Sequence, residues 1–227
     1  MKEILLGRTG IRTGSIGADC GALQACSFEK SRTLLQEALE AGIRFFDIGL
    51  PEEELQKRIG HGLIGQRSQV ILAGSFVPDT PQAFRKQLEQ VLRGLKTDYL
   101  DLCQIHDPDY MPRRGDAEGV YDAMQQALEK GYIRSIGITT GNRNVLLHAL
   151  EFGWYDTVQY PWTTGSDEEE LELLRFCREA EMGSISVPPE EWPEDLAAEL
   201  DFLQSFEDHL TLWTLQEETV SRLRDRL

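Results

Sequence analysis

The sequence predicts an α/β fold: a (β/α)8 TIM barrel with a short N-terminal β-hairpin. Three observations predict it. Short, largely apolar runs recur along the chain, as in strands that are buried on both faces of a parallel sheet. Amphipathic segments with apolar residues at helical spacing separate these runs. The connections are short, and eight strand–helix units alternate. A doubly wound open sheet is the alternative that this pattern also allows.

We expect a strand at each apolar run that is followed by a turn or a polar residue. We assign them to residues 15–20, 44–49, 69–76, 99–106, 133–140, 156–162, 183–188 and 209–215. Before the first of them, KEILLG and IRTGS flank the turn sequence RTG. This pattern predicts a small hairpin that closes the N-terminal end of the barrel.

The helices are expected between these strands. We assign them to residues 28–42, 52–63, 80–95, 119–131, 142–153, 166–183, 193–207 and 216–227. Thr80 and Pro81 have the residue types of an N-cap and a first helical position. Gly42 stands where a left-handed residue ends a helix. No linker or low-complexity tract divides the chain, so we expect one domain spanning residues 1–227.

Composition excludes several classes of function. The formal net charge is −16, which disfavours nucleic acid and anionic membranes as partners, because both need a positive surface. No apolar stretch approaches the roughly 20 residues of a transmembrane helix. MKEILLGRTG lacks the apolar stretch of a signal peptide, so a cytoplasmic protein is expected. The four cysteines have no zinc-like spacing, so no metal site is expected from them.

Five segments, in order, resemble motifs of the aldo-keto reductase family. They are LGRTGIRTGSIG, ALEAGIRFFDIG, GLKTDYLDLCQIH, ALEKGYIRSIGITTGN and YDTVQYPW. Together they cover about residues 3 to 187. The resemblance is to a truncated, degenerate bacterial member of the family. Some bacterial members carry an iron–sulfur module after the barrel, but this chain has no cysteine cluster to hold one.

The resemblance implies a reaction and a set of four residues. Family members transfer hydride between NADPH and a carbonyl, a Tyr donates the proton, and a Lys, an Asp and a His assist it. Asp47 and His106 stand at the family's Asp and His positions. Glu52 stands at the Tyr position and Ser75 at the Lys position. A solvated glutamate is ionised at neutral pH and donates no proton, and serine supplies no charge. The sequence therefore predicts a deficient hydride-transfer site.

The cofactor end also departs from the family pattern. Gln159 matches the family's carboxamide-binding Gln, and Trp162 stands where an aromatic ring stacks on the nicotinamide. Trp162 is equally consistent with a cover over the core. The loops VPPEEWPED and TLQEET carry carboxylates and no basic residue where the cofactor's phosphates bind in the family. Several negative charges within a few ångströms of a polyanion strongly weaken its binding. We therefore expect no bound cofactor. If the protein does still reduce carbonyls, the expected cofactor is NADPH.

Three functions remain open from the sequence. The first is a protein of reductase ancestry, a pseudoenzyme that binds a small molecule or a protein at the old mouth. The second is an NADPH-dependent reductase of aldehydes or ketones with a rearranged site, in which Tyr110 or Tyr160 donates the proton. The third is metal-assisted or acid–base chemistry by mouth residues, namely Asp47, Glu52, Glu53, Glu54, His106 and Asp107. The sequence indicates neither the ligand nor the oligomeric state.

Overall fold

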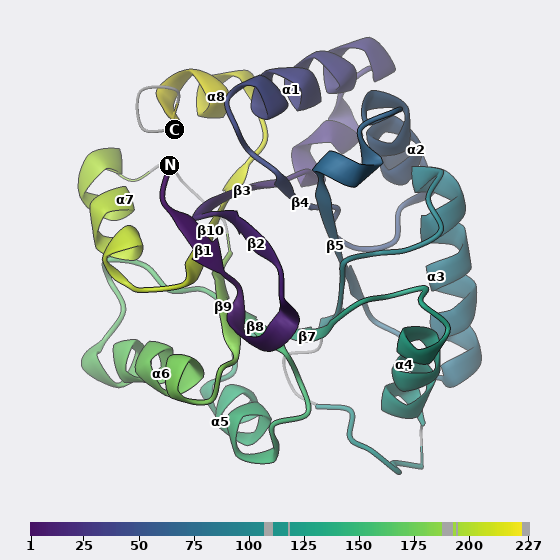
Figure 1. The fold of residues 1–227 in the computed structure, drawn as a ribbon, viewed down its shortest axis with the longest axis vertical. Helices are drawn as coiled ribbons and strands as arrows, with labels where there is room; N and C mark the ends of the chain where they lie inside the picture. The colour runs from purple at the N-terminus through teal and green to yellow at the C-terminus, as the bar shows by residue number, and fades with distance from the viewer. Residues whose placement is uncertain (107–110, 118, 188–192, 194, 224–227) are drawn as a thin grey trace.

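The predicted barrel is confirmed. The computed structural model describes residues 1–106, 111–117, 119–187, 193 and 195–223. Eight parallel strands close on themselves in the order β10-β3-β4-β5-β6-β7-β8-β9, and helices surround them (Figure 1). The strands are β3 (Ile16–Asp19), β4 (Phe45–Asp47), β5 (Ile71–Phe76), β6 (Leu102–His106), β7 (Ile136–Thr139), β8 (Thr157–Tyr160), β9 (Gly183–Ser186) and β10 (His209–Thr214). Because the sheet closes, none of these strands is an exposed edge.

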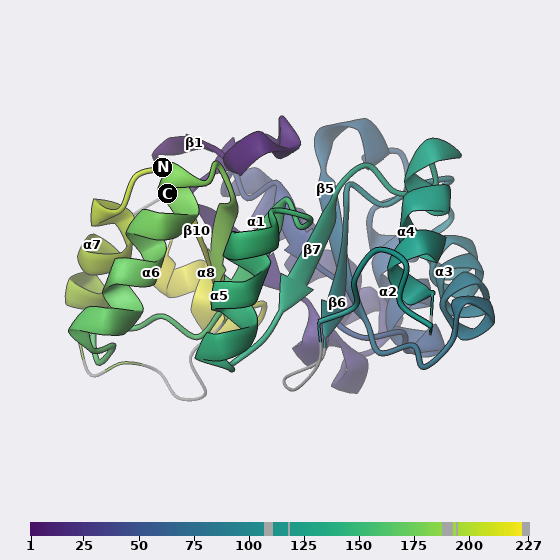
Figure 2. The ribbon, with the colours of Figure 1, turned by 90° about the horizontal axis from the view of Figure 1, so that it is seen from below.

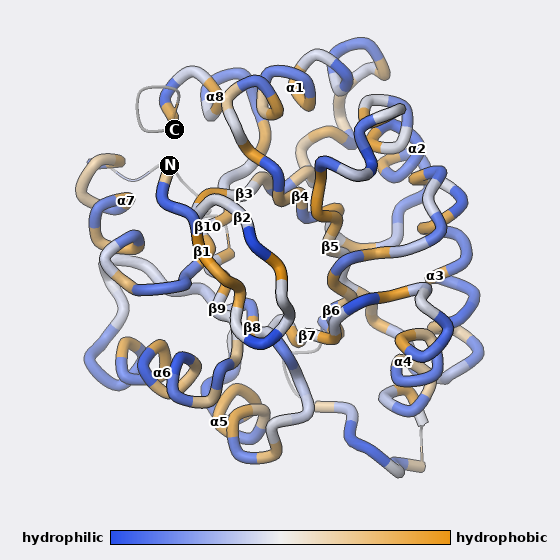
Figure 3. The backbone as a smooth tube through the Cα atoms, viewed as in Figure 1, coloured by the Kyte–Doolittle hydropathy of each residue, from blue (hydrophilic) through white to orange (hydrophobic). Residues whose placement is uncertain are grey.

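Each expected helix has a counterpart in the described residues. The helices are α1 (Phe28–Glu40), α2 (Glu53–Gly62), α3 (Pro81–Leu95), α4 (Val120–Glu129), α5 (Arg143–Phe152), α6 (Glu168–Glu179), α7 (Leu196–Ser205) and α8 (Glu217–Leu223). Apolar residues of these helices belong to the buried core, and hydrophobic and hydrophilic residues alternate along the helices (Figure 3). This arrangement produces the helical periodicity of the sequence.

Capping residues set the N-terminus of α3 and the C-terminus of α1 as expected. The Thr80 hydroxyl accepts a hydrogen bond from Ala83 N at 3.1 Å, and Pro81 is the first residue of α3. Gly42, after α1, has a φ of 93°. The expected end of α6 at Gly183 was wrong, because Gly183 begins β9. A Cβ atom there would lie 2.8 Å from the Leu6 side chain, so the close packing of the hairpin explains this glycine.

The N-terminal hairpin closes one end of the barrel, as predicted. Strands β1 (Glu3–Leu5) and β2 (Arg12–Gly14) pair antiparallel and lie across that end (Figures 1 and 2). The hairpin residues Ile4 and Leu6 are buried in a cluster with residues from five barrel strands. The strand residues of this cluster are Phe45, Ala73, Leu102, Ile185, Leu210 and Leu212. We call this cluster the barrel floor.

An ion-pair cluster also lies at the N-terminal end. Asp101, just before β6, is 6% exposed. Its carboxylate pairs with Arg67 at 2.8 Å and with Arg134 at 3.2 Å, and it accepts from Leu72 N at 3.0 Å. Both guanidinium groups stack on the Tyr99 ring, within 3.8 Å of its centroid. The buried charge at this end is therefore neutralised by the chain itself.

Candidate functional site

At the C-terminal end of the barrel strands, the interior side chains are polar, whereas those of the barrel floor are apolar. Side chains alternate between the two faces of a strand, so a residue two positions beyond a floor residue also faces the barrel interior. This relation holds for Asp47 after Phe45, for Ser75 after Ala73, and for Gln104 and His106 after Leu102. The carboxyl ends of parallel strands carry the active sites of TIM barrels. We call the inward residues at this end the mouth layer: Asp19, Asp47, Ser75, Gln104, His106, Thr139 and Gln159.

Hydrogen bonds across the barrel join five of these seven side chains. The Gln159 side chain, on β8, is hydrogen-bonded to Asp47 on β4. Gln104 Nε2 donates to Gln159 Oε1 at 2.7 Å, although β7 lies between their strands. The Ser75 and Thr139 hydroxyl oxygens are 3.4 Å apart across β6. The mouth layer therefore holds two hydrogen-bonded groups above an apolar floor, one of Asp47, Gln159 and Gln104 and one of Ser75 and Thr139.

Asp47 is the central charged group of this layer. The residue is 4% exposed, and its carboxylate accepts a hydrogen bond from Gly49 N at 2.9 Å. Burial raises the pKa of Asp47 to about 7, the negative charge of Asp19 adds to the rise, and the bonds from Gly49 and Gln159 oppose it. Among the described residues, no lysine or arginine acts on this carboxylate. Asp47 therefore remains a buried acid without a counter-ion.

Asp19 is a mouth residue that our sequence reasoning missed. It ends β3 and pairs in register with Asp47 on β4. Burial raises its pKa as well, against the lowering effect of the hydrogen bond from Gly21. The signal was present in the sequence, since SIGAD ends in an acid just as RFFD does. Adjacent carboxylates favour sharing a proton, because like charges at short range raise one another's pKa.

Gln104 and Thr139 were also missed. Gln104 lies two residues before His106, so strand periodicity places both on one face. Gln104 is fully buried, and its Oε1 atom has no hydrogen-bond partner among the described residues. Thr139 ends β7 opposite both His106 and Gln159. These residues look ordinary in the sequence and become significant only through the register of the barrel.

The two other predicted catalytic positions lie at the rim. Glu52 is the N-cap residue of α2; its side chain is half-buried and makes no capping hydrogen bond, and its backbone N donates to Gln56 Oε1 at 2.7 Å. His106 ends β6 and is exposed. Glu53 and Glu54 face solvent and pair with Lys57. Roles for Glu52 and His106 stay predictions.

Tyr160 and Trp162 face away from the mouth layer. Tyr160 follows Gln159, and its hydroxyl donates to Glu170 on α6 at 2.9 Å. Burial and this bond to a carboxylate raise the pKa of Tyr160 to about 12. Trp162 is 1% exposed, and its indole N–H donates to the Glu170 carbonyl at 2.9 Å. Both rings therefore pack between the sheet and α6.

The described part of the cofactor end is acidic. Residues 188–192 and 194, within the loop after β9, lie outside the described residues, as do Asp107 and Tyr110. After β10, Glu217 and Glu218 start α8, where Glu217 pairs with Lys30 and Glu218 with Arg222. Both of these glutamates are therefore already paired with basic side chains of the same chain.

Neither a metal centre nor a membrane span emerges from the described ranges. Within residues 1–106, 111–117, 119–187, 193 and 195–223, no three His, Cys, Asp or Glu side chains are grouped to hold a metal ion. Over the same ranges, no helix combines the length and the apolar character that crossing a bilayer requires. The mouth layer thus offers carboxylates, amides and hydroxyls for hydrogen bonding and proton exchange.

Comparison with known proteins identifies the family. The model of the Aldo/keto reductase family matches residues 4–189, so the chain belongs to this family. The aldo-keto reductase YhdN of Bacillus subtilis is 28% identical over 195 residues, covering 78% of this chain and 56% of YhdN. L-galactose dehydrogenase of Arabidopsis thaliana is 25% identical over 203 residues, covering 81% and 64%. The chain thus spans less than two thirds of the length of these relatives.

Solved structures share the fold over nearly the whole chain. An aldo/keto reductase from Klebsiella pneumoniae, in complex with NADP and acetate, superimposes with a TM-score of 0.80 at 19% identity, covering 99% of this chain and 89% of that one. The holo form of an aldo-keto reductase from Bacillus halodurans gives 0.79 at 18% identity, with 99% and 90% coverage. At this identity the likeness establishes the barrel and leaves the chemistry open.

Proposed function

We propose that this aldo/keto reductase family protein does not transfer hydride and instead binds a small polar ligand at the mouth layer. The observation that carries the proposal is the environment of Asp47. It is a buried acid, 4% exposed, surrounded by hydroxyl and amide side chains and without a cation among the described residues. A ligand that donates hydrogen bonds or carries positive charge would satisfy it.

The tyrosine hydroxyls support the loss of carbonyl reduction. Reduction needs a proton donor beside the carbonyl oxygen. Tyr121 donates to the Trp154 carbonyl, Tyr155 to the Pro112 carbonyl and Tyr160 to Glu170. Tyr99 stacks at the N-terminal end, and Tyr132 lines a groove between α3 and α4. No described tyrosine is therefore beside Asp47.

The cofactor residues support the same proposal. NADP and NADPH are bound by the Klebsiella pneumoniae structures that share this fold. In this chain, Gln159 is engaged by Asp47 and Gln104, Trp162 is covered, and Glu217 and Glu218 follow β10. A dinucleotide would have to displace these contacts and approach the two carboxylates.

Titration with NADPH tests the proposal directly. We expect no saturable change in NADPH fluorescence at micromolar protein, and no NADPH consumption with a panel of aldehydes and ketones. Micromolar binding, or turnover abolished by His106→Ala, would overturn the proposal and restore the rearranged reductase as the function. The reductase from Klebsiella pneumoniae, prepared in the same way, is the positive control for binding.

Acid–base chemistry without a redox cofactor is a second candidate, because the pKa of Asp47 is raised to about 7. A group that titrates near the working pH is suited to proton transfer. Carbon-13 NMR of the aspartate carboxyl groups measures this titration, with Asp47→Asn assigning the signal. A midpoint below about pH 5 would remove this candidate, since the carboxylate would then hold no proton near neutrality.

A further inference from the structure

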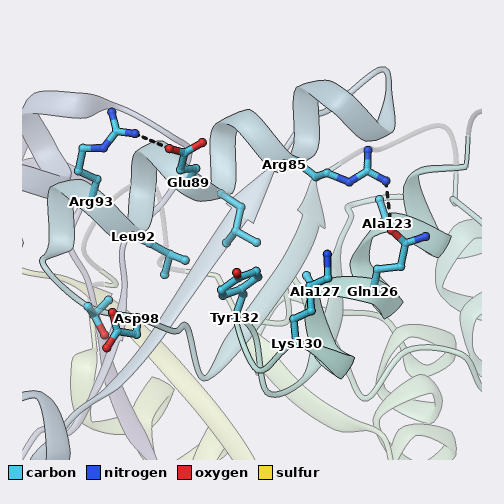
Figure 4. A pocket seen from close by; sticks show the side chains of 12 residues that line it. Arg85, Glu89, Leu92, Arg93, Asp98, Ala123, Gln126, Ala127, Lys130 and Tyr132 are labelled. Atoms are coloured by element: carbon cyan, nitrogen blue, oxygen red, sulfur yellow. Dashed lines mark hydrogen bonds and ion pairs between the residues drawn. The ribbon is translucent and has the colours of Figure 1, made fainter.

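A hollow lined by α3 and α4 lies outside the mouth layer. It is a groove of about 550 Å³ between α3 and α4 (Figure 4). That volume lies within the range of roughly 300 to 1,000 Å³ found for small-molecule sites. The lining residues are Arg85, Leu88, Glu89, Leu92, Arg93, Thr97, Asp98, Ala123, Gln126, Ala127, Lys130 and Tyr132. None of them belongs to the mouth layer.

The floor of this groove is apolar and partly uncovered. Leu88, Ala123 and Ala127 are 4%, 2% and 6% exposed and form its base. Leu92 and Tyr132 face one another across it, and Tyr132 is 48% exposed (Figure 4). An aromatic ring left half in water loses the stabilisation that burial would give it. The groove therefore has apolar surface available to a ligand.

One end of the groove is positively charged. Arg85 on α3 donates to Gln126 Oε1 on α4 at 3.2 Å, and Lys130 lies beside this bridge (Figure 4). Within the described chain, neither Arg85 nor Lys130 forms an ion pair. Arg93, toward the other end, is neutralised by Glu89 at 2.5 Å. On a chain of net charge −16 this end is a local positive site.

We propose that the α3–α4 groove binds a small apolar anion. Its carboxylate, sulfonate or phosphate group would accept hydrogen bonds from Arg85 and Lys130, and its apolar body would lie on Leu88, Leu92 and Tyr132. Charge-assisted hydrogen bonds at one end and apolar contact along the rest give such a ligand both orientation and affinity. The Arg85–Gln126 bridge crosses the groove, which favours a short ligand over a docked helix of another protein.

Fluorescence titration with anilinonaphthalene sulfonate, an apolar anion, tests the site. We expect saturable binding by the intact protein and displacement by decanoate, whereas uncharged decanol displaces the probe much less. Lys130→Glu should weaken binding by about tenfold or more, since it replaces a charge-assisted bond with repulsion. Lys86→Glu is the matched control. Lys86 neighbours Arg85 on α3 but lines a different hollow, so this variant should bind within about twofold of the wild type.

Methyl NMR locates the ligand independently of the variants. Decanoate should shift the methyl signals of Leu88, Leu92, Ala123 and Ala127. Circular dichroism and thermal midpoints establish that both variants are folded. The proposal is overturned if Lys130→Glu and Lys86→Glu bind the probe equally, if decanol displaces it as well as decanoate, or if the shifted methyl groups lie elsewhere. Absence of saturable binding by the wild type also overturns it.

Discussion

Two buried aspartates lie at opposite ends of the barrel, and only one of them has basic partners. Asp101, at the N-terminal end, is 6% exposed and has two arginine partners and a backbone N–H donor. Asp47, in the mouth layer, is 4% exposed and meets Gln159, Gly49 N and a second acid, Asp19. Burial is nearly the same, so the difference lies in the partners.

The two ends of the barrel therefore affect stability differently. Burying a charge is costly unless it is paired and hydrogen-bonded. The N-terminal end satisfies its acid within the chain, together with an apolar floor, and so contributes stability. The mouth leaves an acid without a counter-ion, which lowers stability, and the ligand that we propose would offset that cost. Barrel enzymes divide stability and activity between the same two ends.

Removing Asp101, the paired acid, should have the largest effect on the free energy of unfolding. Asp101→Ala leaves Arg67 partly buried without its partner and frees Leu72 N. Breaking a buried ion pair from one side typically costs about 3–5 kcal/mol. We expect a loss of that size in the free energy of unfolding, measured by urea denaturation at pH 7. A loss below about 1 kcal/mol would show that these ion pairs contribute no more than solvent-exposed ones do.

The unpaired acid should instead make stability depend on pH. Because the pKa of Asp47 is about 7 in the folded protein and near 3.8 when unfolded, the native state binds this proton more tightly. The resulting stability is present below about pH 4 and is lost as pH rises through about 7. In Asp47→Asn this loss is absent. We expect the variant to gain about 2 kcal/mol on the wild type between pH 5 and pH 8.

Urea denaturation of both proteins at the two pH values measures that difference. Carboxylates that do not interact with Asp47 titrate alike in both proteins, so their contributions cancel in the comparison. Asp19→Asn serves as the control for the neighbouring charge, because removing that charge lowers the pKa of Asp47 and reduces the wild-type pH dependence. Equal pH dependence of Asp47→Asn and the wild type would contradict the unpaired acid.

A cation introduced beside Asp47 should give this acid a charged partner, as Asp101 has at the N-terminal end. Ser75→Lys introduces an ammonium group from β5, the strand beside that of Asp47. We expect the pKa of Asp47 to fall and the pH dependence to flatten, with a net change of about 1 kcal/mol in unfolding free energy at pH 8. Carbon-13 NMR of the carboxyl group reports the shift, and Ser75→Met controls for side-chain size. An unchanged Asp47 titration would mean that the ammonium group turns to solvent.

The smallest effect on stability is expected at the rim. His106 ends β6 and is exposed, so His106→Ala should change the unfolding free energy by no more than about 0.5 kcal/mol. Thermal or urea denaturation measures this. A larger loss would show that His106 belongs to the packed structure and would weaken its assignment to a ligand-facing rim.

Much of the fold was readable from local pattern. The apolar runs, the helical spacing and the capping residues placed every barrel strand and helix to within a few residues, and Asp47 and His106 were correctly placed at strand ends. Asp19, Gln104 and Thr139 were missed because each is unremarkable in its own segment. They become part of one layer only when parallel strands bring distant segments into register.

The sequence by itself determined the barrel, the hairpin beneath it and the absence of lysine and tyrosine from the positions that the family resemblance indicated. These depend on residue type and spacing along one segment. Only the tertiary structure decided that Asp47 lacks a counter-ion among the described residues, that Gln159 is held by Asp47 and Gln104, and that Trp162 packs against α6. Burial and pairing depend on residues far apart in the chain, and closure of the barrel brings them together.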